Sequence, residues 1–193
     1  MNTVTTPEKL HFSGDEEADR LLARDPFALL IGFVLDQQVP LQKAFSGPLE
    51  LQRRIGTLDA SDIAALDPEK LDAAFRERPA LHRFPGNMAR RTQDLAAAIA
   101  RDYGGDASRV WSEAKDGKDP HARLLALPGI GDMKADTLVA ILARRFGVRP
   151  AGWESVMPDH PTLGDVDSDD ARERYQAGKR AYKAQLRAEG KKP

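Results

Sequence analysis

The chain has 193 residues, of which 41% are hydrophobic and 31% are charged, and its formal net charge is −1. A chain of this length and composition can bury a core, and its charge argues against a protein that holds nucleic acid by overall basicity. Because it has no cysteine, disulfides, thiol nucleophiles and cysteine-ligated iron–sulfur clusters are excluded, and four scattered histidines disfavour a zinc site. No apolar run approaches the roughly 20 residues that span a bilayer, and the first residues lack a secretory pattern, so we expect a cytoplasmic protein.

Aspartate–proline pairs mark three predicted helix starts, at Asp25-Pro26, Asp67-Pro68 and Asp119-Pro120. Apolar periodicity predicts helices at 27–35, 41–55, 68–75, 86–103 and 107–114. The first of these is nearly all apolar and should be buried on most sides. Since no stretch shows sustained strand alternation, we predict an all-α fold of roughly nine or ten helices.

In the C-terminal quarter of the chain, a stretch rich in proline is followed by a basic stretch with a helical pattern. The stretch 149–164 carries three prolines and two glycines, which predict an ordered loop. Helical pattern resumes from Ser168, a plausible cap, to about Leu186. From Ala171 to Pro193, eight lysines and arginines stand against two glutamates, which indicates either a solvated helix or a basic surface for phosphates.

The most informative motif is LPGIGDMKA at 127–135, a short bend between two predicted helices. The second of these helices carries apolar residues at intervals of three and four up to Phe146 and stops at Gly147. Glycines at 129 and 131 would let backbone N–H groups at the start of that helix approach an anion, and a DNA phosphate is the natural candidate. A plain helix–turn–helix corner uses glycine in the same way and is the structural alternative.

Three segments in one order resemble the helix-hairpin-helix DNA glycosylases, the superfamily that includes endonuclease III. They are LLIGFVLDQQVPLQKA at 29–44, RFPGNMARRTQDLAAAI at 83–99 and LLALPGIGDMKADTLVAIL at 124–142. The resemblance implies a cluster-free branch, because the four-cysteine loop of many endonuclease III-type members is absent.

The resemblance also implies how the chain is organised. It implies a two-lobed all-α fold with double-stranded DNA bound across the cleft between the lobes. One lobe would join 1–28 with 148–193, and the other would be a helical barrel at 29–147 that contains the hairpin at 120–147. We expect a monomer that acts in the nucleoid.

The activity that the resemblance implies is base excision, in which a damaged base is flipped out and its N-glycosidic bond is cut. A carboxylate beyond the hairpin would stabilise the developing sugar cation and orient water. Asp167, in a Val-Asp-Ser context, is the best match, with Asp165 as its main competitor and Asp159 and Glu154 behind. The structural alternative is an acidic loop that stabilises the start of the last helix.

The subtype of reaction depends on Met133, which occupies the position where bifunctional members carry a nucleophilic lysine. Methionine predicts a monofunctional, hydrolytic enzyme. Lys134 is rotated by about 100° and should face elsewhere, toward a phosphate. A shifted hairpin that brings Lys134 into the cleft would instead give a glycosylase/lyase. A non-catalytic DNA-binding protein and a helical interaction module are the remaining alternatives.

Further contacts are implied by the resemblance. Gln37 and Gln38 would fill the gap left by the extruded base, although a pair of helix-capping amides is the structural alternative. Gly129, Ile130, Gly131 and Lys134 would contact DNA. The carbonyls of Leu127 and Ile130 would hold an optional monovalent cation. Trp153 suits either stacking on a base or anchoring its loop.

Overall fold

The computed structural model describes residues 5–190, and every regular element within them is helical. The elements are α1 (Glu16–Arg24), α2 (Pro26–Leu35), α3 (Leu41–Ile55), α4 (Ala60–Ala65), α5 (Pro68–Arg76), α6 (Pro85–Tyr103), α7 (Arg109–Ser112), α8 (Asp119–Leu125), α9 (Asp132–Arg145), the 3-10 helices η1 (Trp153–Val156) and η2 (Leu163–Asp165), and α10 (Asp169–Ala188). The all-α prediction is therefore confirmed.

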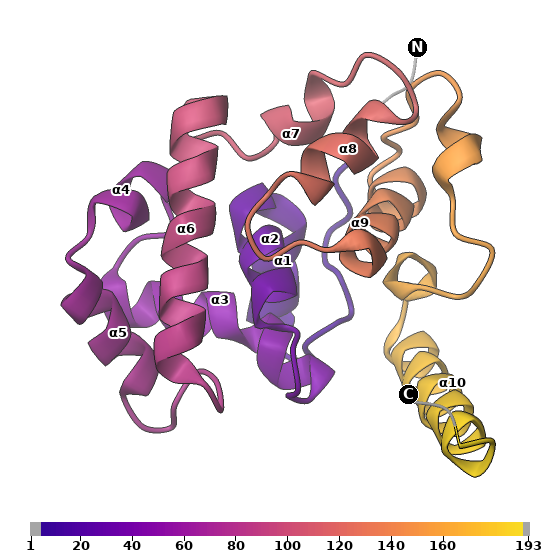
Figure 1. Cartoon of the computed structure of the whole chain (residues 1–193), viewed down its shortest axis with the longest axis horizontal. Coiled ribbons are helices and arrows are strands. Elements are labelled where there is room, and N and C mark those ends of the chain that lie inside the picture. The colour runs from indigo at the N-terminus through magenta and orange to yellow at the C-terminus, as the bar shows by residue number, and fades with distance from the viewer. Residues whose placement is uncertain (1–4, 191–193) are drawn as a thin grey trace.

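Helix α2 lies at the centre of the molecule, with α6 on one side and α9 on the other (Figure 1). Every residue from Phe27 to Leu35 is buried, as its almost entirely apolar sequence predicts. Helix α3 approaches α2 closely because Gly32 leaves room for the ring of Phe45, which would lie 2.6 Å from a Cβ at that position. Phe45 then packs edge-on against Phe12 and Phe33, with centroids 5.2 Å apart in both pairs.

The predicted helix starts agree with the structure at two of the three aspartate–proline pairs. Asp25 accepts hydrogen bonds from two N–H groups of α2, and Asp67 caps α5. Asp119 is not a cap, because α8 begins at Asp119 itself and Lys118 is the flanking residue. Instead, the Asp119 carboxylate accepts a hydrogen bond from the Lys115 N–H in the preceding loop.

Two helices were not predicted. Helix α1 has an acidic first turn and follows Asp15, whose carboxylate caps it by accepting a hydrogen bond from the Ala18 N–H. Negative charge at this end of a helix is favourable, so its acidic composition masked a helix whose Leu21 and Leu22 are buried. Helix α4 is capped by Asp59 and is only six residues long, too short for periodicity to stand out.

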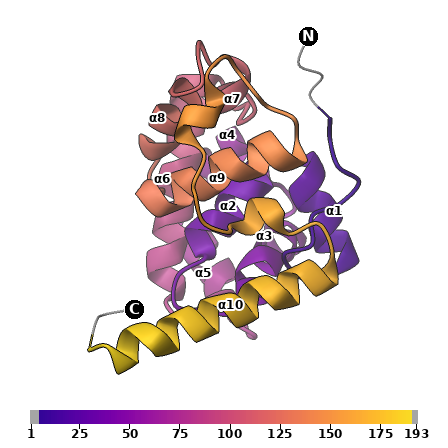
Figure 2. The same cartoon turned by 90° about the vertical axis from the view of Figure 1, so that its right-hand side faces the viewer.

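The N-terminal segment returns to the centre of the fold, whereas the C-terminal helix lies at its edge. Leu10 and Phe12 belong to the same buried cluster as α2, α6 and α9. Figure 2 shows α10 running along one edge of the body, with its C-terminal end projecting beyond it. The division into two lobes at 1–28 with 148–193 and at 29–147 stays a prediction. Within the described residues, no helix is long and apolar enough to cross a membrane.

Candidate DNA interface and active site

The hairpin between α8 and α9 is closed by a hydrogen bond from the Ile130 N–H to the Leu127 carbonyl at 3.2 Å. Its two glycines have different roles. Gly129 has φ +82°, a left-handed conformation, and a Cβ there would lie 3.1 Å from Val34 on α2. Gly131 has an extended backbone, and a Cβ there would meet nothing within 4 Å. The missing side chain at Gly131 therefore leaves the bend open to a close approach from outside.

Helix α9 begins at Asp132, and the preceding residue, Gly131, gives it no side-chain cap. The backbone N–H groups of such a helix end carry partial positive charge and favour an anion. Asp132, in the first turn, is exposed and stabilises this end of the helix in the same way. The negative charge of Asp132 also repels a phosphate, whereas Gly131 beside it leaves room for one.

The two residues after Asp132 point in different directions. The Met133 side chain is 81% exposed and lies in solvent. The Lys134 amine donates a hydrogen bond to the Phe33 carbonyl of α2 at 2.5 Å. Lys134 therefore turns inward to the end of α2, whereas we expected it to face a phosphate. Burial lowers the pKa of Lys134 to about 8, although the negative charge of Asp36 acts in the opposite direction and raises it.

Asp36 ends α2, and its N–H bonds to the Gly32 carbonyl at 3.0 Å. Its side chain is half-buried, and within residues 5–190 no group hydrogen-bonds or ion-pairs with its carboxylate. Burial raises the pKa of Asp36, while the positive charges of Lys179, Lys134 and Lys183 lower it. An unpartnered carboxylate thus lies among three lysines at the end of the central helix.

The turn after Asp36 is held by two residues from the region of α6. The Arg91 guanidinium donates to the Gln37 side-chain oxygen at 3.1 Å, and His82 Nε2 donates to the Gln37 carbonyl at 2.9 Å. His82 Nδ1 accepts from the Phe84 N–H, so these two bonds require the neutral Nε2–H tautomer. Burial lowers the pKa of His82, which agrees with a neutral ring.

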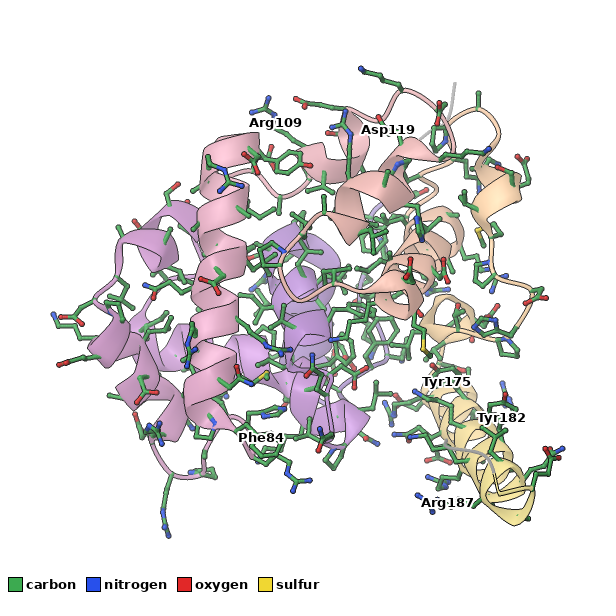
Figure 3. The ribbon with its side chains drawn as sticks, in the orientation of Figure 1. Phe84, Arg109, Asp119, Tyr175, Tyr182 and Arg187 are labelled. Carbon is green, nitrogen blue, oxygen red and sulfur yellow. The ribbon has the colours of Figure 1, made fainter. Side chains whose placement is uncertain are left out.

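The two predicted glutamines therefore differ. Gln37 is tied inward by these contacts, whereas Gln38 is exposed and has φ +54°. A left-handed conformation is unfavourable for a residue with a side chain, so the fold holds Gln38 in it. Exposed Phe84 lies close by, since it follows His82 and Arg83, whose guanidinium covers the Phe84 ring at 4.8 Å. Figure 3 places Phe84 at the lower end of α6.

The two carboxylates predicted beyond the hairpin lie on the segment that leads into α10. Gly164 brings η2 against α9, because a Cβ there would be 2.8 Å from the Ala140 backbone. Asp165 follows on η2, accepts the Thr162 N–H at 2.8 Å and pairs with Arg144 of α9. The Asp167 side chain is exposed, and it accepts a hydrogen bond from the adjacent Ser168 hydroxyl at 3.2 Å.

The stretch 149–164 is an irregular loop with two short 3-10 helices, as its proline content predicts. It is anchored at Gly117, whose N–H bonds to the Ala151 carbonyl at 2.7 Å and whose Cβ would clash with the Gly152 backbone. Trp153 is half-buried, with the Arg149 guanidinium 5.1 Å from its ring centroid. Glu154 and Asp159 are both exposed.

Ser168 precedes α10 and caps it by accepting a hydrogen bond from the Ala171 N–H, as predicted. Gln176 joins it to α3 by mutual amide hydrogen bonds with Gln42. In Figure 3, Tyr175 lies where α10 meets the body, and Tyr182 and Arg187 lie further along the projecting part. Burial, with Asp36 and Asp165, raises the pKa of Tyr175 to about 12. Lys191 and Lys192 of the predicted basic tail lie outside the described residues.

The sequence analysis did not identify Asp36 as a candidate site residue. One signal was available in the sequence. Asp36 directly follows nine apolar residues at the C-terminal end of a predicted helix, where the negative end of the helix dipole disfavours a carboxylate. A charge in an unfavourable place needs a compensating group, and Lys134 and the α10 lysines are 98 or more positions away along the chain. Only the fold places them together.

Comparison with known proteins gives a match to a family and matches to solved structures. No curated protein matches the chain significantly. The chain is similar to the protein in "Structure of a Trapped Endonuclease III-DNA Covalent Intermediate: Estranged-Adenine Complex", with 21% identity and a TM-score of 0.47 over 82% of this chain and 79% of that chain. The model of the HhH-GPD superfamily of base excision DNA repair proteins matches residues 31–187. That match spans most of the chain, which therefore belongs to the HhH-GPD superfamily of base excision DNA repair proteins.

Proposed function

We propose that this protein is a DNA glycosylase that flips a damaged base out of the duplex and hydrolyses its N-glycosidic bond. One observation carries the proposal. The hydrogen bond from Lys134 to the Phe33 carbonyl joins the open, uncapped start of α9 to the end of α2, where an unpartnered carboxylate lies. This contact supports the proposal, because a glycosylase site needs both a helix start that would bind a phosphate and an acidic group that would face the sugar.

In this proposal, the hairpin residues Gly129, Ile130 and Gly131 bind a DNA phosphate through the start of α9. Gln37 and Gln38 contact the strand opposite the extruded base. Lys179 and Lys183 of α10 add positive charge near the end of α2, which supports a role in holding the sugar–phosphate backbone. The protein acts as a monomer on double-stranded DNA in the nucleoid.

Water is the proposed nucleophile. Met133 carries no amine, and its side chain lies in solvent, so it offers the sugar no covalent partner. The carboxylate assists by stabilising the oxocarbenium-like sugar and by orienting water. Asp167 and Asp165 are the two carboxylates that the resemblance offers for this role. Both already hold local partners, Asp167 in Ser168 and Asp165 in Arg144 and Thr162.

The family resemblance also implies a monovalent cation at the hairpin, and the donor atoms fit it. The Leu127 carbonyl accepts only the Ile130 N–H, and no backbone N–H within residues 5–190 donates to the Ile130 carbonyl. These two oxygens would hold the ion, which would add positive charge where a phosphate binds.

The test is a panel of duplexes, each carrying one alkylated, deaminated or oxidised base, followed by alkali to reveal abasic sites. We expect cleavage after alkali for at least one lesion and none without alkali. Binding of duplex without base release from any lesion would favour the non-catalytic alternative. Binding that does not weaken with salt would favour a helical interaction module, because phosphate contacts release counterions.

A second candidate activity is favoured by the environment of Lys134. Its inward position and its pKa of about 8 give the amine a larger neutral fraction near neutral pH than an ordinary lysine has. Such an amine could form a Schiff base with the sugar and lead to strand cleavage. Borohydride reduction during the reaction would then trap a covalent protein–DNA complex, which Lys134→Ala would abolish. Hydrolysis by water predicts no trapped complex.

A further inference from the structure

His82 is a buried, titratable side chain to which the proposed reaction assigns no role. It is 1% exposed, and both of its ring nitrogens are hydrogen-bonded. Nε2 donates to the Gln37 carbonyl at 2.9 Å, and Nδ1 accepts from the Phe84 N–H at 3.0 Å. The ring therefore joins the turn that follows α2 to the segment that starts α6.

The bond to the Gln37 carbonyl acts on the conformation of Gln38. That carbonyl belongs to the planar peptide unit that joins Gln37 to Gln38, so fixing its direction restricts φ of Gln38. Gln38 has φ +54°, a left-handed conformation that a residue with a side chain adopts only when its surroundings hold it there. On the other side, Val39 packs against the hydrophobic core. The exposed side chain of Gln38 thus projects from a turn that is fixed before and after it.

Arg91 of α6 holds the same turn through a different group. Its guanidinium donates to the Gln37 side-chain oxygen at 3.1 Å. The side chain and the main-chain carbonyl of Gln37 are therefore both bonded, one to Arg91 and one to His82. Arg90, the preceding residue, is exposed instead.

We propose that His82 is a positioning residue that holds Gln38 in the conformation in which it enters the gap left by an extruded base; this rests on the proposed function. The arrangement requires a neutral ring. Protonation places a hydrogen on Nδ1, which then faces the Phe84 N–H, so two donors meet and the bond is lost. The ring is then no longer anchored from the α6 side, and Gln38 relaxes to an ordinary backbone conformation.

The groups around His82 place this change on the acid side of neutrality. Burial lowers the pKa of His82, whereas the Gln37 and Leu35 carbonyls raise it. The positive charges of Lys43 on α3 and of Arg83 lower it further. We therefore expect His82 to take up its proton below pH 6.5, the ordinary value for this side chain.

Two other charged groups belong to the same turn. Arg91 keeps its charge throughout this range. Asp36 directly precedes Gln37, and burial raises its pKa, so acidification acts on Asp36 as well. A pH dependence that comes from Asp36 would persist in a variant without His82, whereas one that comes from His82 would not.

The experiment compares two duplexes that differ at one position: a tetrahydrofuran abasic site, which leaves a gap in the base stack, and an ordinary base pair. We expect the intact protein at about pH 7.5 to bind the abasic duplex at least about ten-fold more tightly, because no base has to be extruded and Gln38 fills the gap. This preference should fall as the pH drops below 6.5. Gln38→Ala measures the part of the preference that Gln38 supplies, which we expect to be about three-fold or more.

Two substitutions separate the two bonds of the ring. The glutamine amide reaches as far as Nε2, so His82→Gln still donates to the Gln37 carbonyl but takes up no proton. The asparagine amide reaches only as far as Nδ1, so His82→Asn serves the Phe84 N–H and leaves that carbonyl free. We expect His82→Gln to keep the preference down to about pH 5, and His82→Asn to lose as much of it as Gln38→Ala does. The same two exchanges at exposed His160 are the matched controls and should change neither the preference nor its pH dependence.

Three results would overturn this role for His82. The first is a preference that survives acidification although nitrogen NMR of the imidazole rings shows His82 protonated. The second is a folded His82→Asn variant with the full preference. The third is an equal loss in His82→Gln and His82→Asn, which would mean that the ring acts through packing alone.

A second pair of variants decides the matter if the melting temperature shows that His82→Asn does not fold. Arg91→Met frees the Gln37 side chain and should lower the preference by about two-fold, the effect of roughly one hydrogen bond. Arg90→Met removes the same charge from an exposed neighbour and should leave the preference unchanged. Equal preferences in these two variants would overturn the role of the turn.

Base release is measured separately on the lesion panel. A protein whose preference for the abasic duplex depends on His82, but which releases no base, would refute the glycosylase proposal and leave the positioning role intact. Base release together with a preference that is the same in His82→Asn and in the intact protein would refute the positioning role alone.

Discussion

Replacing Asp132 by asparagine should have opposite effects on stability and on DNA binding. Asp132 lies in the first turn of α9, which has no side-chain cap, so its charge stabilises the helix by about 0.3–1 kcal/mol. If the same turn binds a phosphate, that charge repels it. Two like charges about 6 Å apart in water repel by roughly 0.7 kcal/mol, which corresponds to a factor of about three in affinity.

We therefore expect Asp132→Asn to melt at a slightly lower temperature and to bind duplex about three-fold more tightly. Fluorescence anisotropy with a labelled duplex at about 50 and about 200 mM salt measures the gain, which should shrink as salt rises because screening increases. Asp67→Asn is the control, since it removes the same charge from the start of α5, away from the hairpin. An equal gain in Asp67→Asn, or tighter binding in neither variant, would refute a phosphate site at the hairpin.

Three further substitutions test single features. Gln38→Gly should relieve the left-handed backbone and stabilise the fold by about 0.5 kcal/mol, yet weaken duplex binding; a loss of stability in urea would contradict the strain. Gly164→Ala should destabilise the protein by about 1–3 kcal/mol, because its Cβ would press on the Ala140 backbone, and an unchanged melting temperature would show that η2 is not in close contact. Lys134→Met should remove a pH dependence. The folded-state pKa of about 8 lies below the ordinary 10.5, so the unfolded chain binds more protons in that range and this lysine makes stability rise with pH there. Urea midpoints at pH 7 and pH 10 should therefore diverge less in the variant, and equal divergence would mean that the Lys134 amine titrates normally.

Much of the fold was predictable because local signals and burial agree. Helix α3 begins at Leu41 and ends at Ile55 before a left-handed Gly56, as its apolar spacing and glycine stop predict. Ser168 caps α10, and Asp25 caps α2, for the same local reasons. Helix α1 was missed because its acidic residues resemble a solvated loop, although they stabilise a helix start.

The candidate site was less predictable, since its contacts join distant segments. The hairpin's sequence predicts its bend, but the direction of Lys134 depends on where the end of α2 lies. The significance of Asp36 likewise depends on α10 crossing the same region. Neither fact follows from spacing along the chain, because both arise from how α2, α9 and α10 pack.

The burial of α2 constrains how this protein can diverge. Any substitution in that helix disturbs packing on several sides and displaces the groups at its C-terminal end. Such a substitution would therefore lower both stability and activity. In the irregular stretch at 149–164, residues 162–164 are buried, and Gly164 packs against α9. Glu154, Ser155, Asp159 and His160 are exposed, so these positions tolerate exchanges that α2 cannot. Directed evolution toward another lesion should therefore accumulate changes in that stretch and leave Phe27 to Leu35 almost untouched.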